Sequence, residues 1–149
     1  METSHKQIGA LPHRRSPSGQ TQILLVTSRG SGQWIVPKGW PMDGRSNPQA
    51  AAREAYEEAG VVGKIASKPI GSFTYEKALK GTTQPAQFQV DVYPLHVDRQ
   101  LTCWPEVHQR QTAWIEVGQT DMIANLELRH IIDQWLWSME SRPYKRATR

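Results

Sequence analysis

The sequence predicts an α/β fold in which helices pack on a mixed β-sheet. The apolar run Ile23-Leu24-Leu25-Val26 and the alternating apolar residues of 86–97 are typical of buried strands. The Ala-rich residues 50–59 contain no strong helix breaker, and the apolar residues of 128–136 recur at helical spacing. Strands and two helices in this order favour an α/β sandwich.

Length and composition are typical of a single globular domain. The 149 residues are 38% hydrophobic and 21% charged, and they contain no internal repeat or long linker, so we expect one domain over 1–149 with its core at about 7–137. The net charge of +4 favours anionic ligands such as phosphates. The single cysteine, Cys103, excludes an internal disulfide. Without a membrane-length apolar run or a signal peptide, we expect a cytoplasmic protein that spans no membrane.

Gly, Pro and polar residues divide the chain into short elements. Residues 1–6 are expected to be a loose start, Pro12 to end the first strand, and 13–19 to form a basic turn. Residues 29–32 resemble a hairpin turn, and 76–85 a basic loop. The expected strands are 7–11, 22–27, 34–36, one or two within 63–75, 86–97, and 111–117 as the partner of 86–97. Leu128, Ile131, Ile132, Trp135 and Leu136 form the apolar face of the last helix, and a basic tail begins at Ser141.

The helix at 46–59 has signals at both ends. Ser46 followed by Gln49 is a capping-box pattern, and Pro48 is tolerated in the first turn. Gly60 stands where a left-handed residue ends many helices. At about 100° per residue, the small apolar side chains fall on one side of this helix, and Glu54, Glu57 and Glu58 fall on the other.

Three carboxylates on one helical face admit two interpretations. They form either a solvated acidic face, with Arg53 pairing locally, or a site for a divalent cation that offsets their repulsion. Carboxylate oxygens suit Mg²⁺ or Mn²⁺. The spacing alone leaves both interpretations open.

The stretch from Gly39 to Val61 resembles the signature of the Nudix hydrolases. That signature reads Gly-x5-Glu-x7-Arg-Glu-U-x-Glu-Glu-x-Gly-U, where U is a bulky apolar residue. The positions that match are Gly39, Arg53, Glu54, Glu57, Glu58, Gly60 and Val61, with Ala55 as a small version of the first U. One position departs: Arg45 stands where the signature has its first Glu, which in the family often pairs with the signature Arg. We expect Asp43 to offer Arg53 a substitute partner.

The resemblance implies a fold, a cofactor and site residues. It implies a Nudix-type α/β/α sandwich with a central mixed sheet and the use of Mg²⁺ or Mn²⁺. Glu54, Glu57 and Glu58 would bind metal together with the backbone carbonyl of Lys38. Glu57 would be the base for the attacking water, with Glu54 as the alternative. Gly39, Arg53 and Gly60 would maintain the structure of the motif.

Segments outside the signature resemble one branch of the family. Residues 34–41, 90–95 and 104–114 are similar to diphosphoinositol polyphosphate phosphohydrolases, and the likeness covers roughly residues 7–137. Members of that branch cleave diphosphate groups on inositol phosphates, and many also cleave diadenosine polyphosphates. The resemblance therefore implies a phosphoanhydride hydrolase acting on such substrates, which agrees with the basic charge of the chain.

Several cations are candidates to bind substrate phosphates. Arg29 and Arg110 are favoured because both lie in segments that resemble phosphate-contacting motifs of the branch, whereas an ordinary surface role stays open for each. The other candidates are Lys6, Arg14, Arg15, Lys77 and Lys80. Trp104 and Trp114 are interpreted as core residues in preference to walls of a substrate cleft.

Three functional hypotheses follow. The first is a metal-dependent hydrolase of diphosphoinositol or diadenosine polyphosphates. The second is a Nudix hydrolase of another nucleotide, such as a nucleoside triphosphate, a nucleotide sugar or an RNA 5′ end. The third, favoured by Arg45, is a weakly catalytic Nudix domain that binds nucleotide or RNA. The expected partner is a small anionic phosphate compound, with no membrane or nucleic-acid partner expected, and the chain is expected to be a monomer or dimer.

Overall fold

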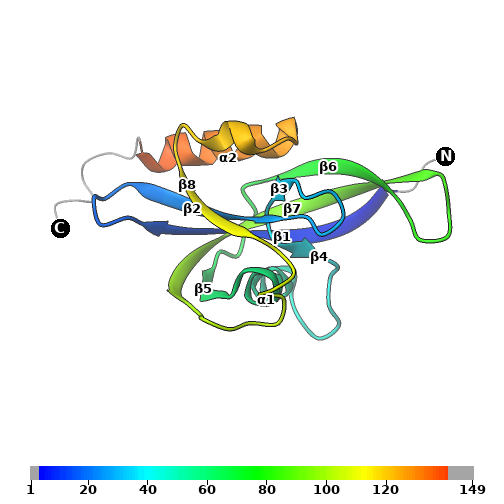
Figure 1. Cartoon of the computed structure of the whole chain (residues 1–149), viewed down its shortest axis with the longest axis horizontal. Helices are drawn as coiled ribbons and strands as arrows, with labels where there is room; N and C mark the ends of the chain where they lie inside the picture. Colours follow the sequence, from blue (N-terminus) through cyan, green and yellow to red (C-terminus); the bar gives the residue numbers. More distant parts are fainter. Residues whose placement is uncertain (1–3, 141–149) are drawn as a thin grey trace.

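The computed structural model describes residues 4–140 as a sheet between two helices (Figure 1). In chain order, the elements are β1 (Ser4–Arg15), β2 (Thr21–Thr27), β3 (Trp34–Ile35), β4 (Lys38–Gly39), α1 (Asn47–Ala59), β5 (Val61–Ile65), β6 (Gly71–Ala78), β7 (Pro85–Gln100), β8 (Thr112–Glu116), the 3₁₀ helix η1 (Thr120–Met122) and α2 (Leu126–Glu140). The predicted basic tail from Ser141 and residues 1–3 lie outside the described residues.

The sheet is mixed, as expected. β1 and β7 run parallel at its centre, in register from Ser4 opposite Gln87 to His13 opposite His96. All other pairings in the described chain are antiparallel. The strand order is β3-β2-β1-β7-β5, with β4 also paired to β1, β6 to β7, and β8 to β2.

Apolar residues fill a core on each face of the sheet. Because side chains alternate along a strand, the unbroken apolar run of β2 serves both faces. Ile23 and Leu25 pack toward α2, whereas Leu24 and Val26 pack toward the alanines of α1. Figure 1 shows α2 and α1 on opposite sides of the sheet. The predicted α/β/α sandwich is therefore confirmed.

The first strand is longer than the sequence suggested. β1 begins at Ser4, passes through Pro12 and continues to Arg15, so the expectations of a loose start at 4–6, a strand end at Pro12 and a turn at 13–15 were wrong. On one side, β1 pairs with β4 through Ile8 and Gly9 and with β2 from His13 onward. Pro12 lies in the gap between these two partners, where its missing N–H costs no ladder hydrogen bond.

The predicted pairing of 86–97 with 111–117 was also wrong. β8 pairs with β2, with Trp114 opposite Leu24. β7 is long enough to accommodate β6 and then β5 in tandem on its other edge, so both of its edges are occupied. The interval 63–75 does contain parts of two strands, and the expected loop at 76–85 is shorter because Glu76–Ala78 belong to β6.

The last helix has the predicted apolar face. Leu128, Ile132 and Leu136 are buried against the sheet, and Ile131 and Trp135 pack beside them. Neither helix of residues 4–140 combines the length and apolar character needed to cross a membrane.

Candidate active site

Helix α1 is held at both ends as its sequence predicts. The Ser46 hydroxyl accepts the Gln49 N–H, and the Gln49 side chain accepts the Ser46 N–H, which completes a capping box. Gly60 ends the helix in the left-handed conformation with φ 70°. The buried alanines of α1 pack on the sheet at short range, so the helix is fixed close to β4.

Strand β4 brings the backbone of Lys38 and Gly39 against two carboxylates of α1. A Cβ at Gly39 would overlap the Glu54 carboxylate, so a larger residue at this position would displace that carboxylate. The Lys38 N–H points at Glu58 Oε1 at 3.4 Å. The entrance of the helix and its acidic face are therefore in direct contact.

Glu54 and Glu58 form a close pair in which Glu58 is buried and Glu54 is partly exposed. Glu58 is 4% exposed, and the two carboxyl groups are hydrogen-bonded to each other. Burial is the largest cause that raises the pKa of each carboxyl group. For Glu58, Arg110 opposes the rise, and Glu54 and Glu106 add to it. For Glu54, the hydrogen bond with Glu58 and the charge of Arg110 oppose the rise, and Glu57 and Glu106 add to it. Without a cation, one carboxyl must hold a proton for the pair to share a hydrogen bond.

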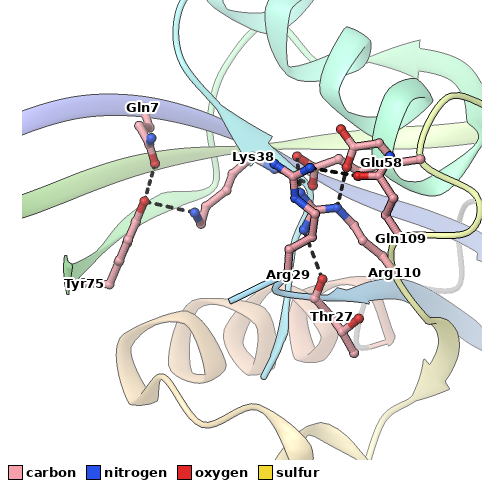
Figure 2. Close-up of polar contacts among 9 residues, drawn as sticks. Gln7, Thr27, Arg29, Lys38, Glu58, Tyr75, Gln109 and Arg110 are labelled. Atoms are coloured by element: carbon pink, nitrogen blue, oxygen red, sulfur yellow. Dashed lines mark hydrogen bonds and ion pairs between the residues drawn. The ribbon is translucent and has the colours of Figure 1, made fainter. Parts of the chain in front are cut away.

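The buried side chain of Arg110 connects Glu58 to the Thr27 carbonyl oxygen (Figure 2). Its side chain is 9% exposed, with Nη2 3.4 Å from Glu58 Oε2 and Nε 2.8 Å from Glu106 Oε1. Nη1 donates to the Thr27 carbonyl oxygen at 3.0 Å. The Glu106 N–H donates to the Glu57 carbonyl oxygen at 3.0 Å, so the segment before β8 is bound to α1.

Glu57, the third carboxylate of α1, pairs with Arg53 and does not line the cavity described below. Its Oε2 accepts the Arg53 Nε–H at 2.7 Å. Arg53 thus has a partner within its own helix, and the expected pairing with Asp43 is absent from the described residues. Arg45 is exposed and contacts the Met42 sulfur.

Lys38 extends from β4 toward β6. Its Nζ donates to the Tyr75 hydroxyl at 3.0 Å, and that hydroxyl donates to Gln7 Oε1 at 2.7 Å (Figure 2). Burial is the main cause that lowers the pKa of Lys38 to about 8 and raises the pKa of Tyr75 to about 12. The three hydrogen-bonded side chains of Gln7, Lys38 and Tyr75 therefore come from three different strands, β1, β4 and β6.

A cavity of about 690 Å³ opens beside these groups. Its lining includes the acidic residues Glu54, Glu58 and Glu106 and the basic residues Arg29, Lys38, Lys77, Lys80 and Arg110. Arg29 Nη1 also donates to Gln109 Oε1 at 2.8 Å. Of the candidate phosphate-binding residues, the structure brings Arg29, Lys77, Lys80 and Arg110 to the cavity.

The structure does not bring Lys6, Arg14 or Arg15 to this cavity. The Arg14 guanidinium lies 3.8 Å from the centre of the Trp114 ring and hydrogen-bonds to Gln22, and Arg15 donates to the Gly19 carbonyl oxygen in the turn after β1. Arg14 and Arg15 lie away from the cavity because β1 extends to Arg15, and its C-terminal end pairs with β2 instead of β4. Neither Trp114 nor Trp104 lines the cavity, and Trp104 packs on Gly60.

Sequence reasoning did not assign Glu106, Gln7, Tyr75 or Trp40 to the site, although all four line the cavity. For Glu106 there was a signal, because Glu106 and Arg110 are four residues apart in a segment already singled out, and such pairs often interact. Gln7, Tyr75 and Trp40 reach the cavity from separate elements, and nothing local in the sequence connects them.

The donor groups fit a hard divalent cation. Glu54 and Glu58 present only oxygen donors, and two adjacent carboxylates that are both ionised need a compensating positive charge. Within residues 4–140, no three acidic, His or Cys side chains converge to form a complete cation site. Mg²⁺ commonly binds through one or two carboxylates plus water and substrate phosphate, so two carboxylates suffice.

Comparison with known proteins identifies the family of the chain. The NUDIX domain family matches residues 5–135. Nudix hydrolase 18, mitochondrial, of Arabidopsis thaliana is 32% identical over 119 residues, which cover 75% of this chain and 64% of that protein. Diphosphoinositol polyphosphate phosphohydrolase 2 of Rattus norvegicus is 34% identical over 105 residues, which cover 69% and 54% of the two chains.

Solved structures share the fold. An Ap4A hydrolase of C. elegans, in a binary complex, superposes with a TM-score of 0.66 at 22% identity and covers 93% of this chain and 99% of that one. The chain belongs to the NUDIX domain family, so the resemblance to the Nudix family is confirmed. It spans 64% and 54% of the lengths of the two relatives described above.

Proposed function

We propose that the protein is a pyrophosphohydrolase that cleaves a phosphoanhydride bond in a highly phosphorylated substrate, a diphosphoinositol polyphosphate or a diadenosine polyphosphate. The proposal rests on the close Glu54–Glu58 pair in a cavity that is also lined by Arg29, Lys38, Lys77 and Lys80. Carboxylates for a cation and basic groups for phosphates are the two requirements of diphosphate hydrolysis.

The proposed cofactor is Mg²⁺ or Mn²⁺, held by Glu54, Glu58 and the Lys38 carbonyl. When bound, such a cation supplies charge stabilisation to the phosphoryl oxygens. Arg110 keeps Glu58 oriented toward the cavity through its 3.4 Å contact and holds Glu106 beside it. Arg29, Lys77 and Lys80 attract and orient the phosphates of the substrate.

Two carboxylates were predicted to accept the proton of the attacking water. Glu54 lines the cavity, whereas the Glu57 carboxylate is held by Arg53 outside it. We therefore assign the proton to Glu54 in preference to Glu57. In this assignment Glu57 keeps Arg53 in place through the 2.7 Å ion pair.

Replacing Glu58 tests the site. Glu58→Gln keeps the shape of the side chain and one acceptor oxygen but removes the negative charge. We expect kcat to fall at least ~100-fold, or about 2.7 kcal/mol of transition-state stabilisation, with the fold intact. Affinity for Mn²⁺, measured by titration calorimetry, should fall in parallel. Asp121→Asn, at an exposed carboxyl in η1, is the matched control and should change neither quantity.

Turnover should be measured with Mg²⁺ and Mn²⁺ on diadenosine polyphosphates, diphosphoinositol polyphosphates, nucleoside triphosphates and nucleotide sugars. A wild-type protein that hydrolyses none of them would contradict the proposed function. A folded Glu58→Gln variant with unchanged turnover and metal affinity would contradict the site.

A further inference from the structure

Gln7 is a polar residue that folding places almost out of contact with water. It lies in β1 opposite Val90 of β7, and it is 7% exposed. A buried amide costs free energy unless its polar atoms are hydrogen-bonded, whereas an apolar residue of the same size would pack there without that cost. The presence of a glutamine at this position therefore calls for an explanation in the contact that its side chain makes.

The hydrogen-bonding capacity of three side chains fixes the direction of the polar chain that links Lys38 to Gln7 (Figure 2). A lysine ammonium group only donates, so the Tyr75 hydroxyl oxygen must accept from Lys38 Nζ, 3.0 Å away. The single proton of that hydroxyl is then left for Gln7 Oε1, 2.7 Å away. Gln7 thus keeps the lone pairs of the Tyr75 hydroxyl available to Lys38.

The Tyr75 ring is fixed independently of its hydroxyl group. It stacks on the buried Phe88 with ring centroids 4.9 Å apart and planes at 12°. Lys38 Nζ also lies 4.3 Å from the centre of the Tyr75 ring, so the ring and the hydroxyl both hold the ammonium group. Removing the acceptor of Gln7 would therefore free the direction of the hydroxyl while the ring stays in place.

Lys38 lines two cavities, so its ammonium group has more than one space to occupy. One is the cavity that contains the carboxylate pair, and the other has a volume of about 360 Å³. Tyr75 and Lys77 also line both. Confining a flexible lysine side chain costs conformational entropy, and the hydrogen bond from Nζ offsets part of that cost. The Tyr75 hydroxyl therefore favours one position of Lys38 at the wall that the two cavities share.

We propose that Gln7 and Tyr75 are positioning residues that hold the Lys38 ammonium group in place for a phosphate group of the substrate. This inference rests on the proposed function and adds to it a role for two residues that neither the signature nor the charge of the chain singles out. A phosphate oxygen in the cavity accepts one of the remaining N–H groups of Lys38. Because a group that is already fixed loses less entropy on binding, Gln7 raises the affinity for phosphate through Tyr75.

A binding experiment with a probe that resists hydrolysis tests the inference independently of turnover. Methylenediphosphonate carries its two phosphorus atoms on a bridging carbon, so it has no phosphoanhydride bond. We expect Gln7→Met and Tyr75→Phe each to weaken its binding in the presence of Mg²⁺ ~3–10-fold by calorimetry, as the loss of one hydrogen bond predicts. Methionine is similar to glutamine in length and lacks its acceptor oxygen, and phenylalanine keeps the stacked ring.

Combined variants separate positioning from a general structural effect. If Gln7 acts only through Tyr75 and Lys38, Gln7→Met should cause no further loss in proteins that already carry Tyr75→Phe or Lys38→Met. Lys38→Met removes the ammonium group and keeps the backbone carbonyl. In kinetics, Gln7→Met should raise KM for a hydrolysed substrate ~3–10-fold and leave kcat within about twofold.

Gln89→Met is the matched control. Gln89 Nε2 donates to the Ser72 hydroxyl at 3.3 Å, so it also pairs with a hydroxyl group of β6, but it does not line the cavity. Its replacement should leave the affinity for methylenediphosphonate and KM unchanged. Thermal melts establish that each variant is folded. If Gln7→Met does not fold, Tyr75→Phe with and without Lys38→Met provides the same comparison.

Three results would overturn the inference. The first is a wild type that does not bind methylenediphosphonate. The second is a folded Gln7→Met variant with the affinity of the wild type. The third is an equal loss from Gln7→Met whether or not Lys38→Met is present. If no phosphorylated substrate is hydrolysed but the loss of affinity depends on Tyr75 and Lys38, the positioning role stands and the proposed hydrolase function fails.

Discussion

Arg29 and Arg110 have similar sequence support, but the structure separates their roles. Arg110 is 9% exposed and holds Glu58, Glu106 and the Thr27 carbonyl at once. Arg29 is exposed at the cavity wall and has one hydrogen bond, to Gln109. The first is therefore a positioning residue for the carboxylates, and the second is free to meet substrate phosphates.

This difference predicts different effects of the two alanine substitutions. Arg110→Ala leaves the buried Glu58 and the partly buried Glu106 without their cation, and we expect a loss of roughly 3 kcal/mol of unfolding free energy together with a large fall in kcat. Arg29→Ala should raise KM ~3–10-fold for the most highly phosphorylated substrate, leave kcat within about twofold, and reduce the salt dependence of KM. Urea unfolding and steady-state kinetics measure both. A purely KM effect of Arg110→Ala would contradict its positioning role.

Arg45 is the residue at which the chain departs from the family signature. Its side chain is exposed and contacts Met42, and Arg53 obtains a partner from Glu57 in the next turn of the same helix. The loop before α1 is also stabilised by the capping box of Ser46 and Gln49. The missing Glu is therefore compensated within α1.

Restoring the signature should have little effect. We expect Arg45→Glu to change turnover less than ~10-fold, or about 1.4 kcal/mol, because an exposed ion pair adds only about 0–1 kcal/mol. Steady-state kinetics of the wild type and the variant on the same diphosphate decide the question. Activity that is absent from the wild type and appears only in Arg45→Glu would show that the chain is a binding domain.

At the scale of elements, the C-terminal end of α1 organises the segment that carries Glu106 and Arg110. The Leu101 N–H donates to the Gly60 carbonyl oxygen at 2.7 Å, and the Glu106 N–H donates to the Glu57 carbonyl oxygen at 3.0 Å. Trp104, between them, covers Gly60 so closely that an added Cβ would overlap the indole ring. These contacts with the C-terminal end of α1 therefore fix the position of the segment that carries Glu106 and Arg110.

Gly60→Ala tests this connection. The left-handed conformation costs an alanine about 1–2 kcal/mol, and overlap with Trp104 adds about 1–2 kcal/mol, so we expect a loss of about 3 kcal/mol in unfolding free energy. Gly32→Ala is the matched control, because Gly32 has φ 74° with no atom near its Cβ position, and it should lose only about 1 kcal/mol. Equal losses in urea unfolding would show that the contact with Trp104 has no energetic role.

At the scale of the whole molecule, His13 connects the sheet to α2. Its ring centroid lies 4.8 Å from that of Trp135 and 5.5 Å from that of His96, and His96 Nδ1 lies 3.8 Å from Asp98. Burial, and to a lesser extent His96, lowers the pKa of His13 from 6.5 to about 4. The folded protein thus keeps His13 neutral over a range in which the unfolded chain protonates it.

This difference gives stability a defined pH dependence. Between pH 6.5 and about 4, the unfolded state binds the extra proton, so the contribution of His13 is complete above pH 6.5 and is lost as the pH falls. Because the ring is partly exposed, we expect His13 to account for about 1 kcal/mol of that loss. His13→Gln should lose about 1 kcal/mol less than the wild type between pH 7 and pH 4.5 in urea unfolding. Parallel pH profiles of the two proteins would contradict the assignment.

The sequence by itself determined the elements whose signals are local. The capping box, the left-handed Gly60 and the apolar face of α2 were predicted correctly, because each depends on residues within a few positions of one another. The signature likewise singles out Glu54, Glu57 and Glu58 by their spacing along one helix. The metal, the substrate, the cytoplasmic location and the oligomeric state stay predictions.

Tertiary structure alone decided what depends on distant parts of the chain. The path of β1 through Pro12, the pairing of β8 with β2, and the displacement of Arg14 and Arg15 from the site follow from sheet register, which no local pattern specifies. The different surroundings of Glu57, compared with those of Glu54 and Glu58, also depend on contacts between distant parts of the chain. β4 and the Arg110 side chain approach the side of α1 that carries Glu54 and Glu58, whereas the Glu57 carboxylate pairs with Arg53.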